Sequence, residues 1–379
     1  MIKAIANKIF CFVKNETVLS AAIILAVISS FFTKPDMQYL DYIDFRTLAL
    51  LFCFMAVMAG LQKTGVFDLL AESLLKRVRG VKSLVFILVM LCFFFSMFIT
   101  NDVALITFVP FTFTVLSMLD KAEKSRLIIP LVAMQTIAAN LGSMLTPVGN
   151  PQNLYLHGIS GLGVIEFIAL MLPYAAVSFI LLAVWILCGK GNGSVEISIS
   201  RAELREKKKI VIYIISFIVC LLTVARLIDY KITLLIVTAL TAAADYRIFA
   251  RVDYTLLLTF IAFFVFIGNM GRVPAFESYL KDIVYGRECI TGVVSSQIIS
   301  NVPAALLLSG FTDNFKPLIV GVNLGGLGTL IASMASLISF KLLGREDKRL
   351  RGKYVIYFSI SNILFLAVLL AVYTCLQNL

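Results

Sequence analysis

Hydrophobic residues fill this sequence in long runs, and the polar residues inside the runs indicate where helices end. The run from Leu84 to Leu119 is almost wholly apolar, except that Thr100, Asn101 and Asp102 lie near its middle. It covers 36 residues, whereas one helix crosses a bilayer with about 20. A carboxylate at that depth is costly unless it faces a cavity or a partner. The pattern therefore predicts a re-entrant hairpin over about residues 82–119, with the polar triplet at its tip.

A second interruption of the same kind contains Ser300, Asn301 and Pro303, and it predicts a second hairpin over about residues 288–312. Three landmarks recur in the same order in both halves, at offsets of 209, 200 and 183 residues: Asp44 with Asp253, Asn101 with Asn301, and Asn140 with Asn323. This agreement indicates an internal duplication. Paired interruptions in corresponding halves are a sequence indication of a transporter's binding site.

The two repeats are predicted at residues 1–188 and 210–379, separated by a charged cytoplasmic connector at 189–209. Each repeat also holds a helix broken at membrane depth, at about 127–157 and about 317–343. Continuous spans are expected near 18–32, 45–62, 164–188, 210–227, 231–246, 253–270 and 354–377, and surface helices near 65–79 and 274–285. The predicted fold class is an all-α polytopic membrane protein. Its two inverted-topology repeats would each contain a re-entrant helical hairpin and a broken transmembrane helix.

Composition and charge agree with a membrane protein and set its orientation. Hydrophobic residues make up 60% of the chain and charged residues 15%, and the mean hydropathy of +0.97 lies outside the soluble range. The net charge of +11 alone would suit nucleic acid, but in the predicted topology 25 of the 33 Lys and Arg residues lie on one face. The positive-inside rule makes that face cytoplasmic. The N-terminus is then cytoplasmic, the C-terminus lies outside, and the halves insert in opposite orientations.

The breaks carry the candidate chemistry. A broken helix presents unpaired amides at the start of one half-helix and unpaired carbonyls at the end of the other. Amides at the positive end of the dipole favour an anion, whereas carbonyls with Asn, Thr and Ser oxygens suit sodium, for which Asn101, Asp102 and Asn301 are candidate ligands. The candidate substrate and ion site comprises the following residues: Thr100, Asn101, Asp102, Asn140, Thr146, Pro147, Gly149, Asn150, Asn153, Ser300, Asn301, Pro303, Asn323, Thr329 and Ser333.

Structural alternatives exist for several of these residues. Asp102 has no acidic counterpart, because Val302 occupies that position; it is a candidate proton or sodium switch, or else an N-cap of the second hairpin helix. The segment from Pro147 to Pro151 could form a simple kink. His157, the single histidine, either forms local hydrogen bonds at the outer end of a span or relays protons. The seven cysteines are scattered without metal-ligand spacing, which is typical of free thiols.

Four segments, FITNDVAL, NLGSMLTPVGNPQNL, SQIISNVPAALLL and VNLGGLGTLIAS, resemble the ion transporter superfamily. That superfamily includes CitMHS-like proteins, ArsB-type arsenite permeases, NhaD-type sodium/proton antiporters and divalent-anion/sodium symporters, and the chain is most similar to the YbiR-like branch. The resemblance implies an elevator-type carrier, a homodimer, in the bacterial cytoplasmic (inner) membrane. In the divalent-anion symporters each tip carries Ser-Asn-Thr, which binds carboxylate and sodium. Here both Asn residues are kept, but Asp102 and Val302 replace the Thr at the third position of the motif, which disfavours a dicarboxylate as the substrate.

The expected function is secondary active transport of a small anion coupled to sodium or protons, without a cofactor. Its partners would be the small-molecule or inorganic ion substrate, the lipid bilayer and a second copy of the chain, and not nucleic acid. A sodium/proton antiporter whose cations compete at Asp102 is an alternative, as is an arsenite-type oxyacid efflux permease. An enzyme would need paired carboxylates, a His cluster or a Ser-Lys dyad within the spans, and the sequence contains none.

Overall fold

The computed structural model describes residues 16–76, 78–189 and 206–378 of the chain. The basic N-terminal stretch and most of the connector predicted at 189–209 lie outside the described residues. Every regular element within the described ranges is helical. The predicted all-α class is confirmed.

The helices of the two halves follow one another in the same order. The first series is α3 (Phe45–Lys63), α4 (Val66–Leu75), α5 (Val81–Ile99), α6 (Asn101–Leu116), α7 (Lys121–Ser143), α8 (Pro151–Ile159) and α9 (Val164–Cys188). The second is α12 (Tyr254–Gly271), α13 (Pro274–Val284), α14 (Glu288–Ile299), α15 (Asn301–Ser309), α16 (Phe315–Leu324), α17 (Met334–Glu346) and α18 (Arg351–Gln377). Outside the two series lie α2 (Thr17–Phe32), α10 (Lys207–Val224), α11 (Tyr230–Asp245), and the short η1 (Met37–Leu40) and η2 (Tyr246–Arg251), while η3 (Lys348–Leu350) connects α17 to α18. The matching order agrees with a duplication, whereas the inverted insertion of the halves stays a prediction.

Both series begin with the same helix cap. The carboxylate of Asp44 accepts a hydrogen bond from the backbone N–H of Thr47 at the start of α3. The carboxylate of Asp253 does the same for Leu256 at the start of α12. An N-cap aspartate satisfies one of the amides that a helix start leaves without an intrahelical partner. The recurring Asp landmark in the sequence therefore has a local structural cause in each half.

Six described helices are long and apolar enough to cross a membrane: those within Met37–Lys63, Val81–Ile99, Val164–Cys188, Tyr230–Arg251, Tyr254–Gly271 and Lys348–Gln377. Four shorter apolar helices, α2, α6, α14 and α16, join them. The expected spans at α7 and α10 are more polar. α7 has charged residues in its first turns and buried polar residues further along, and α10 begins with three lysines. The chain is a multi-pass membrane protein.

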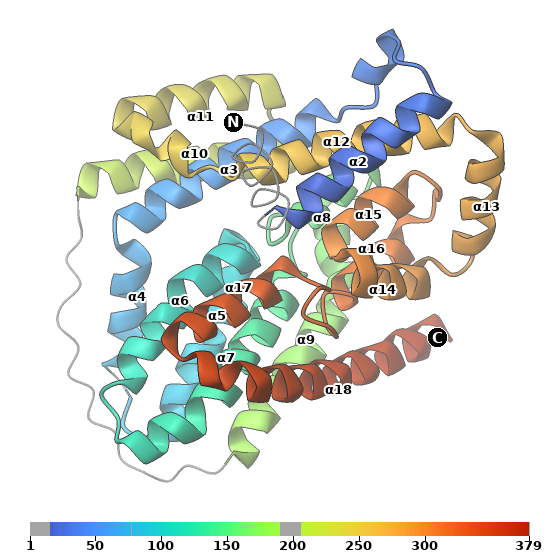
Figure 1. Cartoon of the computed structure of the whole chain (residues 1–379). Coiled ribbons are helices and arrows are strands. Elements are labelled where there is room, and N and C mark those ends of the chain that lie inside the picture. The colour runs from blue at the N-terminus through green and yellow to red at the C-terminus, as the bar shows by residue number, and fades with distance from the viewer. Residues whose placement is uncertain (1–15, 77, 190–205, 379) are drawn as a thin grey trace, which may run out of the picture.

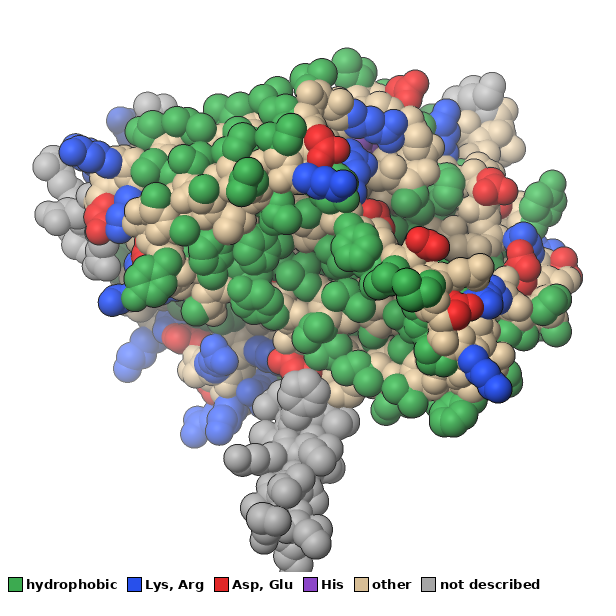
Figure 2. Space-filling model, turned by 90° about the horizontal axis from the view of Figure 1, so that it is seen from above, with side chains coloured by type: hydrophobic (Ala, Val, Ile, Leu, Met, Phe, Trp, Pro, Cys, Tyr) green, Lys and Arg blue, Asp and Glu red, His purple; other side chains and the backbone are tan. Residues whose placement is uncertain are grey.

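The helices form two groups (Figure 1). In the first, which is called the scaffold group below, α2 packs against α12, and α3 packs against α10 and α11. The second, the hairpin group, contains both hairpins, both broken helices, α9 and α18. Figure 2, seen from the scaffold side, shows broad areas of hydrophobic side chains, with charged side chains in separate clusters. Large exposed apolar side chains such as Phe31 and Leu235 are typical of a surface that faces lipid.

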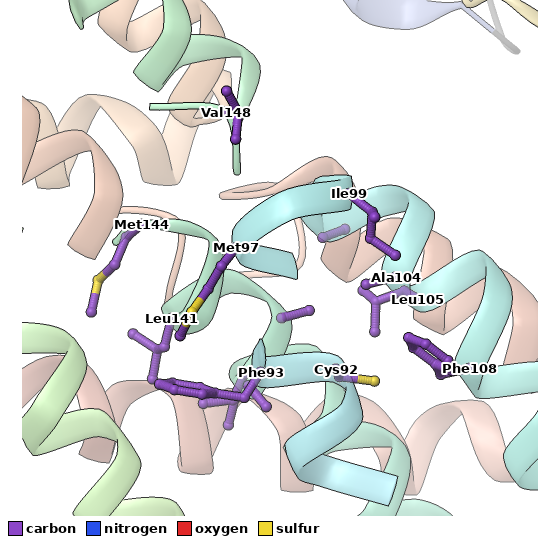
Figure 3. Close-up of a cluster of buried hydrophobic side chains, with 14 of the residues drawn as sticks. Cys92, Phe93, Met97, Ile99, Ala104, Leu105, Phe108, Leu141, Met144 and Val148 are labelled. Carbon is purple, nitrogen blue, oxygen red and sulfur yellow. The ribbon is translucent and has the colours of Figure 1, made fainter. Parts of the chain in front are cut away.

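Close helix contacts hold each hairpin against the broken helix of its own half. A Cβ atom added at Gly142 of α7 would lie 1.9 Å from the carbonyl oxygen of Phe93 in α5, so only glycine allows this separation. Gly321 of α16 lies similarly close to α14, where the corresponding separation from a backbone oxygen is 2.3 Å. In Figure 3, Phe93 and Met97 of the first hairpin lie beside Leu141 of α7. These contacts bring the hairpin tips next to the helix breaks.

Candidate functional site

A single residue makes the turn at each hairpin tip. Thr100 has φ 68° and ψ 152°, and Ser300 has φ 74° and ψ 154°. This combination is nearly confined to glycine, and it costs other residues about 1–3 kcal/mol. Such a conformation persists only where the surrounding structure holds it, and strained positions cluster at functional sites. The two tips are therefore built alike and held in place.

The tips are held by the broken helices of their own halves. The backbone N–H of Asn101 donates to the carbonyl oxygen of Gly149 at 3.2 Å. In the second half the N–H of Asn301 donates to the carbonyl oxygen of Ala332 at 2.9 Å. The residues that follow these carbonyls start α8 and α17 from nearly identical extended conformations. Each half thus pairs one tip with one break in the same geometry.

Both tips and both breaks line one central cavity. Its accessible space is about 10 Å³, room for roughly one water molecule or a small ion. Four helices, α6, α8, α15 and α17, have their N-terminal residues in its wall. The lining residues are Asn101, Asp102, Asn150, Pro151, Gln152, Leu256, Asn301, Val302, Ser333 and Met334.

Hydrogen bonds beside the cavity join the two halves. The side-chain oxygen Oδ1 of Asn140 accepts from Nδ2 of Asn101 at 3.0 Å and from the hydroxyl of Ser333 at 2.9 Å. A second bond between the halves runs from Nδ2 of Asn323 in α16 to Oδ1 of Asn153 in α8, at 2.7 Å. All five side chains are buried. Asn140 therefore acts from behind the cavity, where it positions Asn101 and Ser333 of the wall, while Asn323 holds Asn153 of the first break.

Several buried polar atoms at the site have no hydrogen-bond partner within the described chain. They are Oδ1 of Asp102, Oδ1 of Asn150 and both side-chain polar atoms of Gln152. Burial of a polar group without a partner costs about 1–3 kcal/mol in proteins, and natural structures contain few such groups. Oxygen atoms of this kind can coordinate a cation such as sodium, while the four converging helix starts favour an anion.

Other predicted site residues support the breaks and do not line the cavity. The hydroxyl of Thr146 donates to the carbonyl oxygen of Met97 and accepts from the N–H of Gly149 at 3.1 Å. Thr329 is exposed and bonds to the side chain and backbone of Gln297. Pro147 and Pro303 are buried but absent from the cavity wall. Thr146, Pro147 and Thr329 lie in the loops that position Asn150 and Ser333, whereas Pro303 lies within α15.

The structure decides the capping alternative for Asp102, while the two roles predicted for His157 stay open. The side chain of Asp102 does not cap α6, because that helix has no side-chain cap and Asp102 Oδ1 is unpartnered. His157 lies near the end of α8, is only 1% exposed, and its Nε2 has no hydrogen-bond partner in the structure. Among the described residues no cluster of three or more His, Cys, Asp or Glu could hold a metal ion.

Two glutamines were not predicted as site residues. Gln152 is the second residue of α8 and lines the cavity; its place just after the Asn-Pro pair was the available signal. Gln297 in α14 donates to the carbonyl oxygens of Gly325 and Leu327, and its own oxygen accepts from the N–H of Thr329. It therefore clamps the second break, which has no proline of its own, and a polar residue one turn before the Ser300 tip was its signal.

Comparison with known proteins gives one consistent relationship. Residues 5–317 match the CitMHS family, described as citrate transporter. The chain is 33% identical over 335 residues to the "Uncharacterized transporter MJ0456" of Methanocaldococcus jannaschii, which covers 88% of this chain and 91% of that protein. It is 32% identical over 318 residues to the "Inner membrane protein YbiR" of Escherichia coli, covering 83% and 84%. A shorter match, 31% over 131 residues, covers 35% of this chain and 26% of the rice "Silicon efflux transporter LSI3".

Proposed function

The chain belongs to the CitMHS family and is a membrane transporter, not an enzyme, and from this premise we propose that it is a secondary active carrier of a small anion coupled to sodium or protons. The observation that carries the proposal is the convergence of four helix N-termini on one cavity. Each N-terminus contributes the positive end of its helix dipole, about half a positive charge. The N–H groups of Asn101 and Asn301 themselves are bonded to the breaks, so the dipoles supply the attraction for an anion. Four of them at one place provide an anion site without a lysine or arginine in the wall.

We propose that the coupling cation binds next to the anion, at the side chains of the same four helix starts. Asp102 is the one ionisable residue among the described residues of its wall, and its Oδ1 is buried without a partner. Carboxylate and amide oxygens from Asp102, Asn101 and Asn301 are suitable sodium ligands, and a proton on Asp102 would serve the same purpose. A cation bound there lowers the cost of bringing an anion next to a carboxylate.

A second candidate rests on the charge of the cavity wall. Its described residues include one acid and no base, which also suits a sodium/proton antiporter or the efflux of a neutral oxyacid of the arsenite type. The rice relative is named a silicon efflux transporter, and this supports the oxyacid version. The transported species separates the candidates: an anion for the first, sodium alone for the antiporter and a neutral oxyacid for the efflux permease.

The mechanism is proposed to be of the elevator type, in a homodimer in a bacterial inner membrane with the N-terminus cytoplasmic and the C-terminus outside. The separation of the helices into a scaffold group and a hairpin group supports this proposal, because the residues of the cavity wall come mainly from the hairpin group. Leu256 of α12 is the exception and contributes an apolar contact from the scaffold group.

Uptake into proteoliposomes tests the proposal. Purified protein would be supplied with phosphate, sulfate, citrate, succinate or arsenite under an imposed sodium or pH gradient. We expect one anion to be transported only with a gradient, and Asn101→Ala and Asn301→Ala to abolish that uptake while the protein still folds. Asp102→Asn should remove the dependence on the gradient. Unchanged uptake in both Asn variants would contradict the assigned site.

Asn378→Ala is the matched control for the two Asn variants. Asn378 lies at the far end of α18 and takes no part in the cavity wall, so uptake should equal that of the unmodified protein. Gradient dependence that survives in Asp102→Asn would exclude Asp102 as the coupling group. Transport of arsenite, with no transport of phosphate, sulfate, citrate or succinate, would favour the oxyacid candidate over the anion.

A further inference from the structure

A second hollow, of about 640 Å³, lies at the C-terminal end of α8. The start of α3 and the turn between α10 and α11 complete its wall, which includes Arg46, Gly158, Arg226 and Asp229. None of its lining residues belongs to the central cavity. The hollow and the central cavity lie at opposite ends of α8, which has nine residues and a rise of about 1.5 Å per residue. A volume of this size accommodates a small ligand.

Two guanidinium groups meet at the end of α8. Nη2 of Arg226 donates to the carbonyl oxygen of His157 at 3.4 Å. Nη1 of Arg46 lies 3.3 Å from the position that a Cβ at Gly158 would take, and Nη2 of Arg46 donates to the carbonyl oxygen of Thr223, also at 3.3 Å. Each guanidinium has five N–H donors, so these long single bonds leave most donors available. Two cations at one place repel each other unless an anion lies between them.

The nearby carboxylates are engaged as helix caps. Asp44 accepts from the backbone N–H and the hydroxyl of Thr47, and Asp229 accepts from the N–H of Lys231 at 2.8 Å. Within the described part of the chain, neither Arg46 nor Arg226 forms an ion pair. Arg226 also has φ 62°, a conformation that residues other than glycine adopt infrequently. A strained backbone thus presents a charged side chain to the hollow.

We propose that this hollow binds a phosphate- or sulfate-like oxyanion, free or as the headgroup of an anionic lipid, between Arg46 and Arg226. Arginine matches such oxyanions because its planar fork donates two parallel hydrogen bonds. The bound oxyanion would connect the end of α8, in the hairpin group, to α3 and the α10–α11 turn, in the scaffold group. This site goes beyond the proposed transport function, because it uses none of the central residues.

Binding of inorganic phosphate to the full chain tests the site. Calorimetric titration would use protein in phosphatidylcholine nanodiscs, with ionic strength kept constant by chloride. Loss of a charge-assisted pair costs about 1.5–3 kcal/mol, so Arg226→Gln should weaken binding about tenfold to a hundredfold. Asp229→Asn keeps the cap of α11 but removes a negative charge from the wall, and it should tighten binding by up to about fivefold.

Lys231→Gln is the matched control, since Lys231 is an exposed cation beside the hollow that does not line it. Its affinity for phosphate should stay within about twofold of the unmodified protein, because exposed charges are screened by salt. Equal weakening in Lys231→Gln and Arg226→Gln, or no weakening in Arg226→Gln, would overturn the site. The Asn101→Ala/Asn301→Ala variant should keep phosphate binding, which separates this result from any failure of transport.

A second set of nanodiscs containing phosphatidylglycerol distinguishes the two sources of the oxyanion. If phosphatidylglycerol weakens phosphate binding to the unmodified protein, but leaves the residual phosphate binding of Arg226→Gln unchanged, the site binds a lipid headgroup. Binding that is insensitive to phosphatidylglycerol assigns it to a free oxyanion. Both results require the arginine pair. If the effect of phosphatidylglycerol on phosphate binding were lost in Lys231→Gln and not in Arg226→Gln, the arginine site would be contradicted.

Discussion

Replacement of Gln152 by Met is expected to stabilise the protein and to stop transport. Gln152 is 1% exposed, and neither its Oε1 nor its Nε2 has a partner in the structure. An amide buried in this way costs about 1–3 kcal/mol. Methionine has a similar shape without the polar atoms and adapts to irregular cavities. The free energy of unfolding should therefore rise by about 1–3 kcal/mol.

The neighbouring residue provides a contrast of opposite sign. Asn153 is 0% exposed, its Nδ2 donates to three carbonyl oxygens of the first break, and its Oδ1 accepts from Asn323. Asn153→Leu removes these bonds and leaves their buried partners unpaired, and each strongly buried unpaired group lowers the free energy of unfolding by about 1–3 kcal/mol. We expect a net loss of about 2–5 kcal/mol from this change.

Reversible unfolding in detergent, followed by far-ultraviolet circular dichroism, would measure both variants, and proteoliposome uptake would measure transport. The expected pattern is a more stable but inactive Gln152→Met and a less stable Asn153→Leu. If Gln152→Met lost stability to the same degree as Asn153→Leu, the glutamine would be a structural residue. Full transport by Gln152→Met would remove it from the binding site.

Two further changes test the packing behind the site. Asn140→Ala leaves two buried donors without their shared acceptor, so it should lower the free energy of unfolding by about 2–5 kcal/mol. The control Asn362→Ala removes one bond within α18 and should lower it by less than about 1.5 kcal/mol. Similar losses for the two variants in unfolding assays would refute the bridging role of Asn140. Gly142→Ala places a methyl group 1.9 Å from the carbonyl oxygen of Phe93 and should reduce the thermal stability and the yield of folded protein. Gly352→Ala, with open space around its Cβ position, should be neutral or stabilising by up to about 1 kcal/mol, and equal behaviour of the two variants would contradict the close contact.

The positions of the hairpins and breaks were predictable from the sequence because the bilayer makes buried polar residues expensive. Thr100 to Asp102 and Ser300 to Asn301 stand out within apolar runs, and helices end within a few residues of the predicted positions: the first hairpin spans 81–116 and the second 288–309. Proline and glycine located the first break for the same reason, since they interrupt intrahelical hydrogen bonds.

The direction of each side chain was not predictable. Thr146, Asn150 and Asn153 all lie in one polar segment, but only Asn150 lines the cavity. Within an irregular segment neither the helical nor the strand period applies, so spacing does not say which side chains face the cavity. The sequence marks Gln297 only as a polar residue one turn before Ser300. Its role depends on contacts with a segment about 30 residues away, and no local pattern contains those contacts.

The proposed transport site requires that both hairpin tips meet at one place within the membrane. Chemical cross-linking measures this most directly, with Asn101→Cys and Asn301→Cys introduced together into a variant whose native cysteines are replaced, and a thiol-reactive linker of about 5 Å. We expect an intramolecular cross-link in the tip pair, detected by mass spectrometry, and none in a control pair of Asn101→Cys with Lys281→Cys on α13. Absence of the tip-to-tip product, with both cysteines shown to react singly, would contradict it.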